Sequence, residues 1–165
     1  MAKTRATKPS RTRTRKTTPG LRMLEKYAVL LGGGVNHRYG LDDGVCIKAN
    51  HAAIAGSLGT AIKNAQERIG HVHRIAAEVS SRSEIKEAVE AGATVLVLSE
   101  VNADKLKDPI DYARELSPAI AVEVSGEINL ENVRSYAEAG PDLIRVDALT
   151  QSVRAKMISF QIQPG

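Results

Sequence analysis

Basic side chains that could hold a small anion recur in the first third of the chain. Arg15 and Lys16 are adjacent, His37 and Arg38 follow a run of glycines, and Lys48 ends an apolar run. Arg binds planar carboxylates or phosphates through paired hydrogen bonds, and Lys adds a compact positive charge. If the fold brings these five residues together, they form a site for carboxylates or phosphates. Their spacing alone does not decide between such a site and separate, solvated charges.

Positive charge is concentrated at the N-terminus. Residues 1–16 carry seven cations and no acid, and because the 165-residue chain has a net charge of +4, residues 17–165 sum to 4 − 7 = −3. Thr, Ala, Pro and Ser separate the cations, which favours an extended basic arm, residues 1–13, that a polyanion would hold. RNA, ribosomal RNA in particular, is the predicted partner, and a solvated tail is the alternative. The predicted RNA-binding residues are Lys3, Arg5, Lys8, Arg11, Arg13, Arg15 and Lys16.

Length and composition exclude several classes of protein. With 165 residues and 42% hydrophobic content, the chain is one domain that can bury a core. No apolar run reaches about 18 residues, so we expect neither a membrane span nor a membrane partner, and the basic N-terminus lacks the apolar segment of a secretory signal. A single cysteine, Cys46, fits a reducing, cytoplasmic compartment. His71 and His73 lack a third ligand, so we predict no metal site there.

Short apolar runs alternate with helical patterns along most of the chain. The predicted strands cover residues 45–48, 75–79, 94–98, 120–124 and 143–146. The predicted helices cover residues 21–31, 57–69, 81–91, 106–116 and 129–139, with Pro109 marking a break or a fresh helix start. Strand starts recur roughly every 20 to 30 residues, the length of one βα unit. A full βα barrel takes roughly 250 residues, so residues 14–165 are predicted to form an incomplete TIM-like βα barrel of parallel strands, an α/β fold.

The elements place polar residues where barrel enzymes carry their chemistry. The carboxyl ends of the predicted strands fall at Lys48, Glu78, Ser99, Ser125 and Asp147. At the other end of the chain, residues 158–162 alternate apolar and polar side chains, as an edge strand does. An uncovered apolar strand finds a partner, so we predict self-association or docking on a larger assembly.

Four motifs in order resemble the barrel domain of quinolinate phosphoribosyltransferase, also called nicotinate-nucleotide pyrophosphorylase (carboxylating). They are residues 14–22, 24–29, 32–38 and 47–51, and the resemblance continues through Glu78, residues 123–126 and residues 148–150. The family joins quinolinate to phosphoribosyl pyrophosphate with Mg²⁺, losing CO₂, in NAD biosynthesis. The resemblance implies that the carboxylates of quinolinate are held by Arg15, Lys16, His37 and Arg38. It also implies that Lys48 lies at the reacting centre and that Glu78 faces the ribose and metal of an active enzyme.

The other half of the site departs from the family pattern. Ser99 stands where the family has a metal-facing and ribose-facing aspartate, and Glu127 and Asp147 replace glycines of two phosphate-cradling loops. A carboxylate about 4 Å from a phosphate costs about 1 to 4 kcal/mol, depending on the local dielectric. Residues before Arg11 do not match the α/β sandwich that precedes the family's barrel and donates an arginine to the site.

Three functions follow from these observations. The chain is either a non-catalytic derivative of the barrel anchored to RNA by its arm, an active phosphoribosyltransferase, or a sensor of quinolinate or a similar diacid. Loss of the metal-facing acid and of both loop glycines favours the first hypothesis. A non-catalytic derivative of this kind is predicted to need no cofactor. The retained cations favour the second, which would need Mg²⁺, and also the third.

Overall fold

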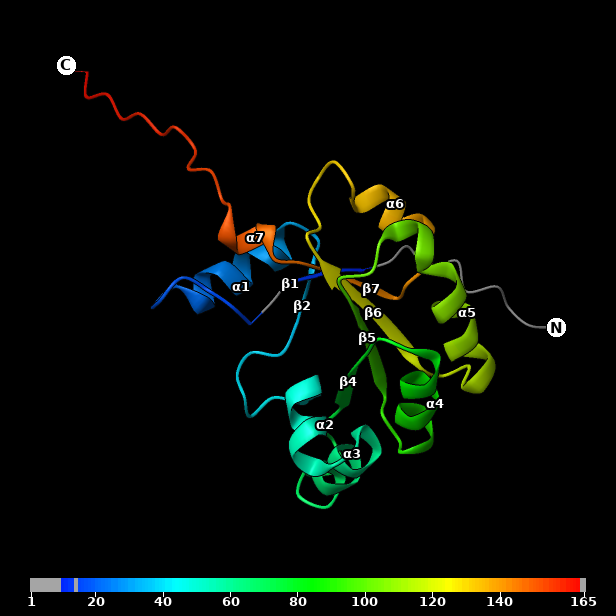
Figure 1. Cartoon of the computed structure of the whole chain (residues 1–165). Coiled ribbons are helices and arrows are strands. Elements are labelled where there is room, and N and C mark those ends of the chain that lie inside the picture. The colour runs from blue at the N-terminus through cyan, green and yellow to red at the C-terminus, as the bar shows by residue number, and fades with distance from the viewer. Residues whose placement is uncertain (1–9, 14, 164–165) are drawn as a thin grey trace.

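The computed structural model describes the backbone of residues 10–13 and 15–163 and the side chains of residues 15–163. This part of the chain forms a seven-stranded sheet in which all neighbouring strands are parallel (Figure 1). The strands are β1 (Ser10–Arg13), β2 (Val35–Asn36), β3 (Val45–Ile47), β4 (Ile75–Val79), β5 (Val95–Ser99), β6 (Ala121–Gly126) and β7 (Leu143–Val146).

The order of the strands makes the sheet an open barrel. It runs β2-β1-β7-β6-β5-β4-β3, so β2 and β3 are its two edges and are not paired with each other. The first strand, β1, lies inside the sheet, where Thr12 is paired with Val35 on one side and with Arg145 on the other. The predicted fold, an α/β domain with an incomplete barrel of parallel strands, is confirmed.

Helices follow the strands, as parallel connections require. They are α1 (Arg22–Leu31), α2 (Ala49–Ala55), α3 (Leu58–Gln66), α4 (Arg82–Glu90), the 3-10 turn η1 (Ala103–Lys105), α5 (Lys107–Leu116), α6 (Val133–Glu138) and α7 (Ala148–Gln151). Ser81 starts α4 by accepting a hydrogen bond from the backbone N–H of Glu84 at 3.2 Å. Gly92, with φ of +90°, lies just beyond its end. Pro109 falls in the first turn of α5, which confirms a fresh helix start there.

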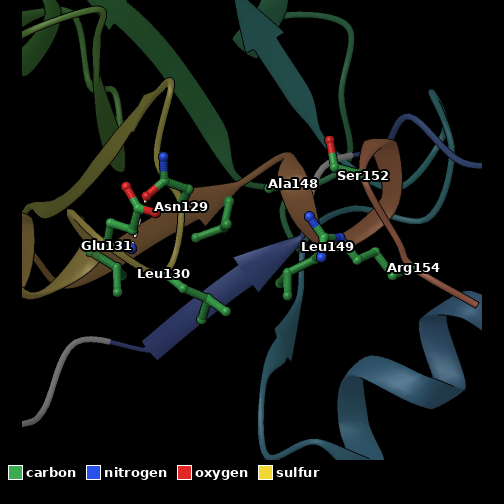
Figure 2. Close-up of a pocket in the computed structure, with 9 residues that line it drawn as sticks. Asn129, Leu130, Glu131, Ala148, Leu149, Ser152 and Arg154 are labelled. Atoms are coloured by element: carbon green, nitrogen blue, oxygen red, sulfur yellow. Dashed lines mark hydrogen bonds between the residues drawn. The ribbon is translucent and has the colours of Figure 1, made fainter. Parts of the chain in front are cut away.

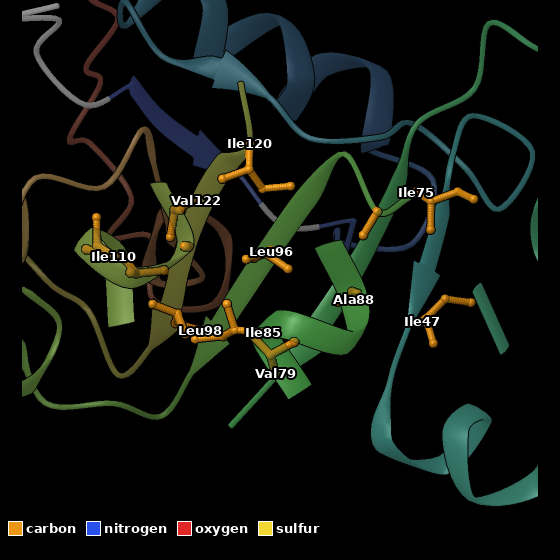
Figure 3. Close-up of a cluster of buried hydrophobic side chains, with 14 of the residues drawn as sticks. Ile47, Ile75, Val79, Ile85, Ala88, Leu96, Leu98, Ile110, Ile120 and Val122 are labelled. Atoms are coloured by element: carbon orange, nitrogen blue, oxygen red, sulfur yellow. The ribbon is translucent and has the colours of Figure 1, made fainter. Parts of the chain in front are cut away.

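The hydrophobic core lies between the helices and the outer face of the sheet. Leu96, Leu98 and Val122 of the central strands pack with Ile85 of α4 and Ile110 of α5 (Figure 3). Alternate residues of a strand point to opposite faces, so the other set faces the inside of the barrel. That set includes Glu78, Val97 and Glu123, paired across β4, β5 and β6, and Ser125 paired with Arg145 across β6 and β7. Because the core holds the residues of the outer face, the charged and polar residues that alternate with them are held on the inner face.

The structure differs from the sequence prediction at both ends of the chain. Residues 10–13, within the range predicted as an arm, form β1 inside the sheet. The boundary of the arm at residue 13 stays a prediction, and residues 1–9, with Lys3, Arg5 and Lys8, lie outside the described residues. The predicted strand at 158–162 is wrong, because this segment forms no ladder and its apolar side chains are exposed. No helix of the described residues is long and apolar enough to cross a membrane.

Candidate functional site

A buried carboxylate forms the floor of the candidate site on the inner face of the sheet. Glu123 of β6 is only 2% exposed. Its Oε1 lies 3.0 Å from Nη1 of Arg145 on β7, and its Oε2 lies 3.6 Å from Nε2 of His37. Neither Glu123 nor Arg145 was predicted to have a role. Two signals were available in the sequence: each residue is a charge at an inner position of an apolar strand, and Glu123 belongs to the family resemblance at residues 123–126.

The surroundings of the floor hold His37 in its neutral form. Burial, and then the positive charges of Arg145, Arg38 and Lys26, lower the pKa of His37 from 6.5 to about 4. Burial raises the pKa of Glu123, against the opposing effect of Arg145. Near neutral pH, His37 therefore offers an uncharged imidazole to a ligand.

Acidification should lower the stability of the protein, because the folded state holds His37 in its neutral form. The pKa of His37 is about 4 in the folded protein and 6.5 in the reference state, so the unfolded chain binds the proton first. Stability should be full above pH 6.5 and should fall as the pH approaches 4, by up to about 3 kcal/mol. Urea unfolding of the wild type and of His37→Gln at several pH values isolates this contribution. Equal pH dependence in the two proteins would contradict it.

A buried lysine holds the segment that carries His37 and Arg38. Nζ of Lys26 on α1 donates hydrogen bonds to the backbone carbonyls of His37 at 2.5 Å and of Arg38 at 3.1 Å. Nη1 of Arg38 donates to the carbonyl of Gly44 at 2.5 Å, just before β3. The pair His37–Arg38 is therefore fixed between α1 and β3, although it lies in a connection and not in a strand.

Two of the predicted cations, Arg38 and Lys48, lie with Arg145 around one point of the barrel interior. Arg38, Arg145 and Lys48 all act electrostatically on the thiol of Cys46, on the inner face of β3, and burial raises the pKa of that thiol. Lys48 follows β3, and its Nζ lies 3.9 Å from Oε2 of Glu78 at the end of β4. The structure therefore brings together His37, Arg38, Lys48 and Glu78 as a group.

The remaining predicted cations lie at the rim. Nζ of Lys16 is 3.3 Å from Oδ2 of Asp147 after β7, and the hydroxyl of Thr150 donates to the Lys16 carbonyl at 3.1 Å. Lys16 is exposed and Arg15 is partly buried. These contacts tie the segment after β1 to the start of α7. Lys16, predicted to hold a substrate carboxylate, is thus paired with a carboxylate of the protein itself.

Comparison with known proteins assigns the domain. The family profile of the quinolinate phosphoribosyl transferase C-terminal domain matches residues 1–161. The chain belongs to this family. It is 43% identical over 150 residues to a "Probable nicotinate-nucleotide pyrophosphorylase [carboxylating]" of Bacillus subtilis and 36% identical over 149 residues to the human nicotinate-nucleotide pyrophosphorylase. Each alignment covers 90% of this chain and 50% of the relative.

The solved structures agree with the sequence comparison. The nicotinate-nucleotide pyrophosphorylase from Francisella tularensis superimposes with a TM-score of 0.82 at 35% identity, over 89% of this chain and 51% of that one. The chain thus spans about half the length of the relatives it matches. What is shared with them is the phosphoribosyl transferase C-terminal domain.

Within this phosphoribosyl transferase domain, the ends of β5 and β6 carry hydroxyls. Oγ of Ser99 and Oγ of Ser125 are 3.0 Å apart. Glu100, which follows Ser99, has a φ of +56°, a left-handed conformation that non-glycine residues rarely adopt. Together with Glu78, Ser99 lines a pocket of about 160 Å³ at the mouth of the barrel.

A larger pocket, of about 590 Å³, lies between the loop after β6 and α7 (Figure 2). It is lined by Asn129, Leu130, Glu131, Val133, Val146, Ala148, Leu149, Ser152 and Arg154. None of the cations predicted to bind a substrate belongs to this lining. The structure thus separates the large pocket from the charged group inside the barrel.

Proposed function

We propose that this domain binds a small aromatic dicarboxylic acid of the quinolinate class and does not transfer a phosphoribosyl group to it. The observation that carries the proposal is the ion pair between Lys16 and Asp147. Asp147, at the end of β7, forms an ion pair with Lys16, which was predicted to bind the substrate. It also adds negative charge to a loop that was predicted to bind phosphate. The proposal assigns this domain to ligand binding in connection with NAD biosynthesis.

The charges of the site support binding of a dianion. Three carboxylates, Glu78, Glu123 and Asp147, each lie within 4 Å of a basic side chain. Five cations of the same region are Lys16, Lys26, Arg38, Lys48 and Arg145, which is two more than the three carboxylates, and His37 is neutral. A dicarboxylate carries two negative charges, which match this excess. Arginine guanidinium groups are suited to the planar carboxylates of such a ligand.

The same region is unfavourable to a phosphorylated sugar. Backbone N–H groups cradle phosphate best where the main chain approaches closely and no acid intervenes. Glu127 follows β6 and Asp147 follows β7, at the two loops where the family resemblance places the phosphate. Since each charge pair about 4 Å apart costs about 1 to 4 kcal/mol, two acids can lower the affinity by several powers of ten.

The residues present do not fit a metal that the protein itself would hold. No three His, Cys, Asp or Glu side chains of the described residues gather as metal ligands. Glu78 is close to Lys48, and the hydroxyl of Ser99 is bonded to that of Ser125. The proposed binding of a dicarboxylate therefore does not depend on Mg²⁺.

Calorimetric titration with quinolinate tests the binding half of the proposal. We expect a dissociation constant of roughly 1 mM, and its loss in Lys48→Met, because Lys48 contributes charge at the site entrance. Lys86→Met is a matched control, since Lys86 is equally exposed and lies 3.8 Å from Glu90, as Lys48 lies 3.9 Å from Glu78. A flat titration of the wild type would overturn the binding proposal.

The same protein, given quinolinate, phosphoribosyl pyrophosphate and Mg²⁺, should form no nicotinate mononucleotide above background. The electrostatic positioning on which such a transfer depends is incomplete without the metal-facing acid and the loop glycines. Turnover near 1 s⁻¹, an ordinary rate for an enzyme, would make the active phosphoribosyltransferase the correct function.

RNA anchoring by the basic N-terminus is a second proposal, favoured by the seven cations without an acid in residues 1–16. Full contact with phosphates should give a slope of about −5 to −6 for log affinity against log salt. A deletion should stop at residue 9, because residues 10–13 form β1. It removes three of the seven cations, so fluorescence anisotropy with a structured RNA should show the slope falling to about −3. Unchanged binding after the deletion would contradict the proposal.

A further inference from the structure

Helix α1 carries its charged residues on one side, which faces the two segments that hold the cations predicted to bind a substrate. Arg22, Glu25 and Lys26 are spaced i, i+3 and i+4, so they lie on one face of the helix, which we call the charged row of α1. Residues 15–18 follow β1, and residues 36–39 follow β2. Each of these segments contains two of the four residues predicted to hold the carboxylates of quinolinate.

The charged row of α1 binds the segment after β1 through two threonines. Nε of Arg22 donates a hydrogen bond to the hydroxyl of Thr17 at 3.3 Å, and a carboxylate oxygen of Glu25 accepts one from the backbone N–H of Thr18 at 3.3 Å. Arg22 also reaches the second segment, because its guanidinium lies 5.9 Å from the centre of the Tyr39 ring. The threonines directly follow one pair of predicted cations, and Tyr39 directly follows the other.

Lys26 holds the second segment most closely. It is only 5% exposed, and its Nζ donates hydrogen bonds to the carbonyls of His37 at 2.5 Å and of Arg38 at 3.1 Å. In the opposite direction, Nδ2 of Asn36 donates to the backbone carbonyl of Lys26 at 3.0 Å. Three consecutive residues are thus bonded to one residue of α1. Hydrogen bonds from a charged donor are roughly twice as strong as neutral ones, so this attachment is firm.

The attachment to Lys26 explains how two neighbouring side chains serve the same side of the barrel. In an extended strand, successive side chains point to opposite faces. After β2 the strand ends, and the carbonyls of His37 and Arg38 both point to one ammonium group. The ring of His37 lies 3.6 Å from Glu123 on the inner face, and Arg38 acts electrostatically on His37 and on Cys46 of β3. Continued strand geometry would have sent one of the two side chains away from this interior.

We propose that Lys26 is a positioning residue of the ligand site, which turns His37 and Arg38 together toward a bound dicarboxylate. It acts through these two side chains and not by contact with the ligand. The other two residues of the charged row have the same role for the segment after β1. The inference rests on the proposed binding of a dicarboxylate. It also gives a role to residues 24–29, one of the four motifs of the family resemblance, to which the resemblance assigned none.

Calorimetric titration with quinolinate is the first test. Lys26→Met keeps the length of the side chain without its ammonium group, so quinolinate should bind about tenfold or more weakly than to the wild type. Lys26→Arg keeps the charge and several N–H donors, so its affinity should stay within about threefold of the wild type. Ile85→Val, in the core between α4 and the sheet, controls for a loss of stability alone and should bind like the wild type. Equal affinity of Lys26→Met and the wild type would overturn the proposal.

Titration of His37 by proton NMR is a second test, which needs no ligand. The charged groups that act on its ring are Glu123, Asp147, Arg145, Arg38 and Lys26. Burial, and then the three cations, lower the pKa of His37 to about 4. In Lys26→Met, one cation is lost and the ring is no longer held in its buried position, so the pKa should rise toward 6.5. In Lys26→Arg and Ile85→Val, it should remain near 4. The signal of His37 is assigned by its absence in His37→Gln.

The two measurements separate this inference from the proposed function. If the wild type does not bind quinolinate but the pKa of His37 rises in Lys26→Met, the proposed function fails and the positioning role stands. If Lys26→Met keeps the circular dichroism spectrum of the wild type and its His37 still titrates near 4, the positioning role is overturned. Should Lys26→Met not fold, Asn36→Ala removes the hydrogen bond to the Lys26 carbonyl instead. A raised pKa of His37 in that variant supports the positioning role, and an unchanged pKa overturns it.

Discussion

Replacing Glu123 by Ala is expected to lower the free energy of unfolding by about 3 to 5 kcal/mol, because it leaves a buried cation without its partner. Glu123 is 2% exposed, and the side chain of Arg145 is only 17% exposed. Removing the carboxylate would leave the guanidinium of Arg145 with no negative charge at 3.0 Å and poor access to water. Urea unfolding at pH 7, monitored by circular dichroism, measures the loss.

Two further variants distinguish the charge effect from a packing effect. Combining Glu123→Leu with Arg145→Met removes both charges and keeps the volume, so most of the stability should return. Glu90→Ala is the control for a carboxylate in an exposed ion pair, and it should cost less than about 1 kcal/mol. If Glu123→Ala costs no more than this control, the floor of the site does not depend on the ion pair.

The second large effect concerns phosphate. Replacing both Glu127 and Asp147 by Gly should raise the affinity for ribose 5-phosphate by a factor of at least about 30, because each acid costs about 1 to 4 kcal/mol near a phosphate. The substitution at Asp147 also removes the carboxylate that lies 3.3 Å from the Nζ of Lys16.

Isothermal titration of the wild type and the double variant measures this change. Glu131→Gly is the control, since it removes an exposed acid from the loop after β6 without altering either predicted phosphate-cradling position. Quinolinate affinity should rise as well, since the variant has two negative charges fewer near the site. Equal affinity for ribose 5-phosphate in the wild type and the double variant would show that the two acids do not face a phosphate.

The five strands β3 to β7 and most helices could be predicted because burial on an open parallel sheet leaves a clear apolar pattern. Residues 75–79 and 143–146 were predicted with the bounds that the structure has. The first two strands could not be predicted in this way. The sequence of β1 is Ser-Arg-Thr-Arg, without an apolar residue, and β2 has only two residues. Their place in the sheet depends on pairing with distant strands, which local patterns do not record.

The residues of the candidate site could be predicted in part, but the ion pairs between them could not. Motif resemblance selected His37, Arg38, Lys48 and Glu78, and the structure places them together. The pairing of Glu123 with Arg145 depends on the register between β6 and β7, and that of Lys16 with Asp147 joins residues far apart in the sequence. The strand predicted at residues 158–162 failed for a related reason, since alternation shows what a strand could bury but not whether a neighbour is present.

The position of β1 between β2 and β7 also sets the order in which the domain can be assembled. Ser10 and Arg11 pair with Leu143 and Ile144, so this seam joins the two ends of the described chain. During synthesis, the central strands can pair soon after they emerge, and β1 can pair with β2, but the seam between β1 and β7 must wait until residues 143–146 have been translated. Closing so long a loop is slow, so the seam should form last in folding. Its backbone amides should then be among the first of the sheet to exchange with deuterium in the native protein.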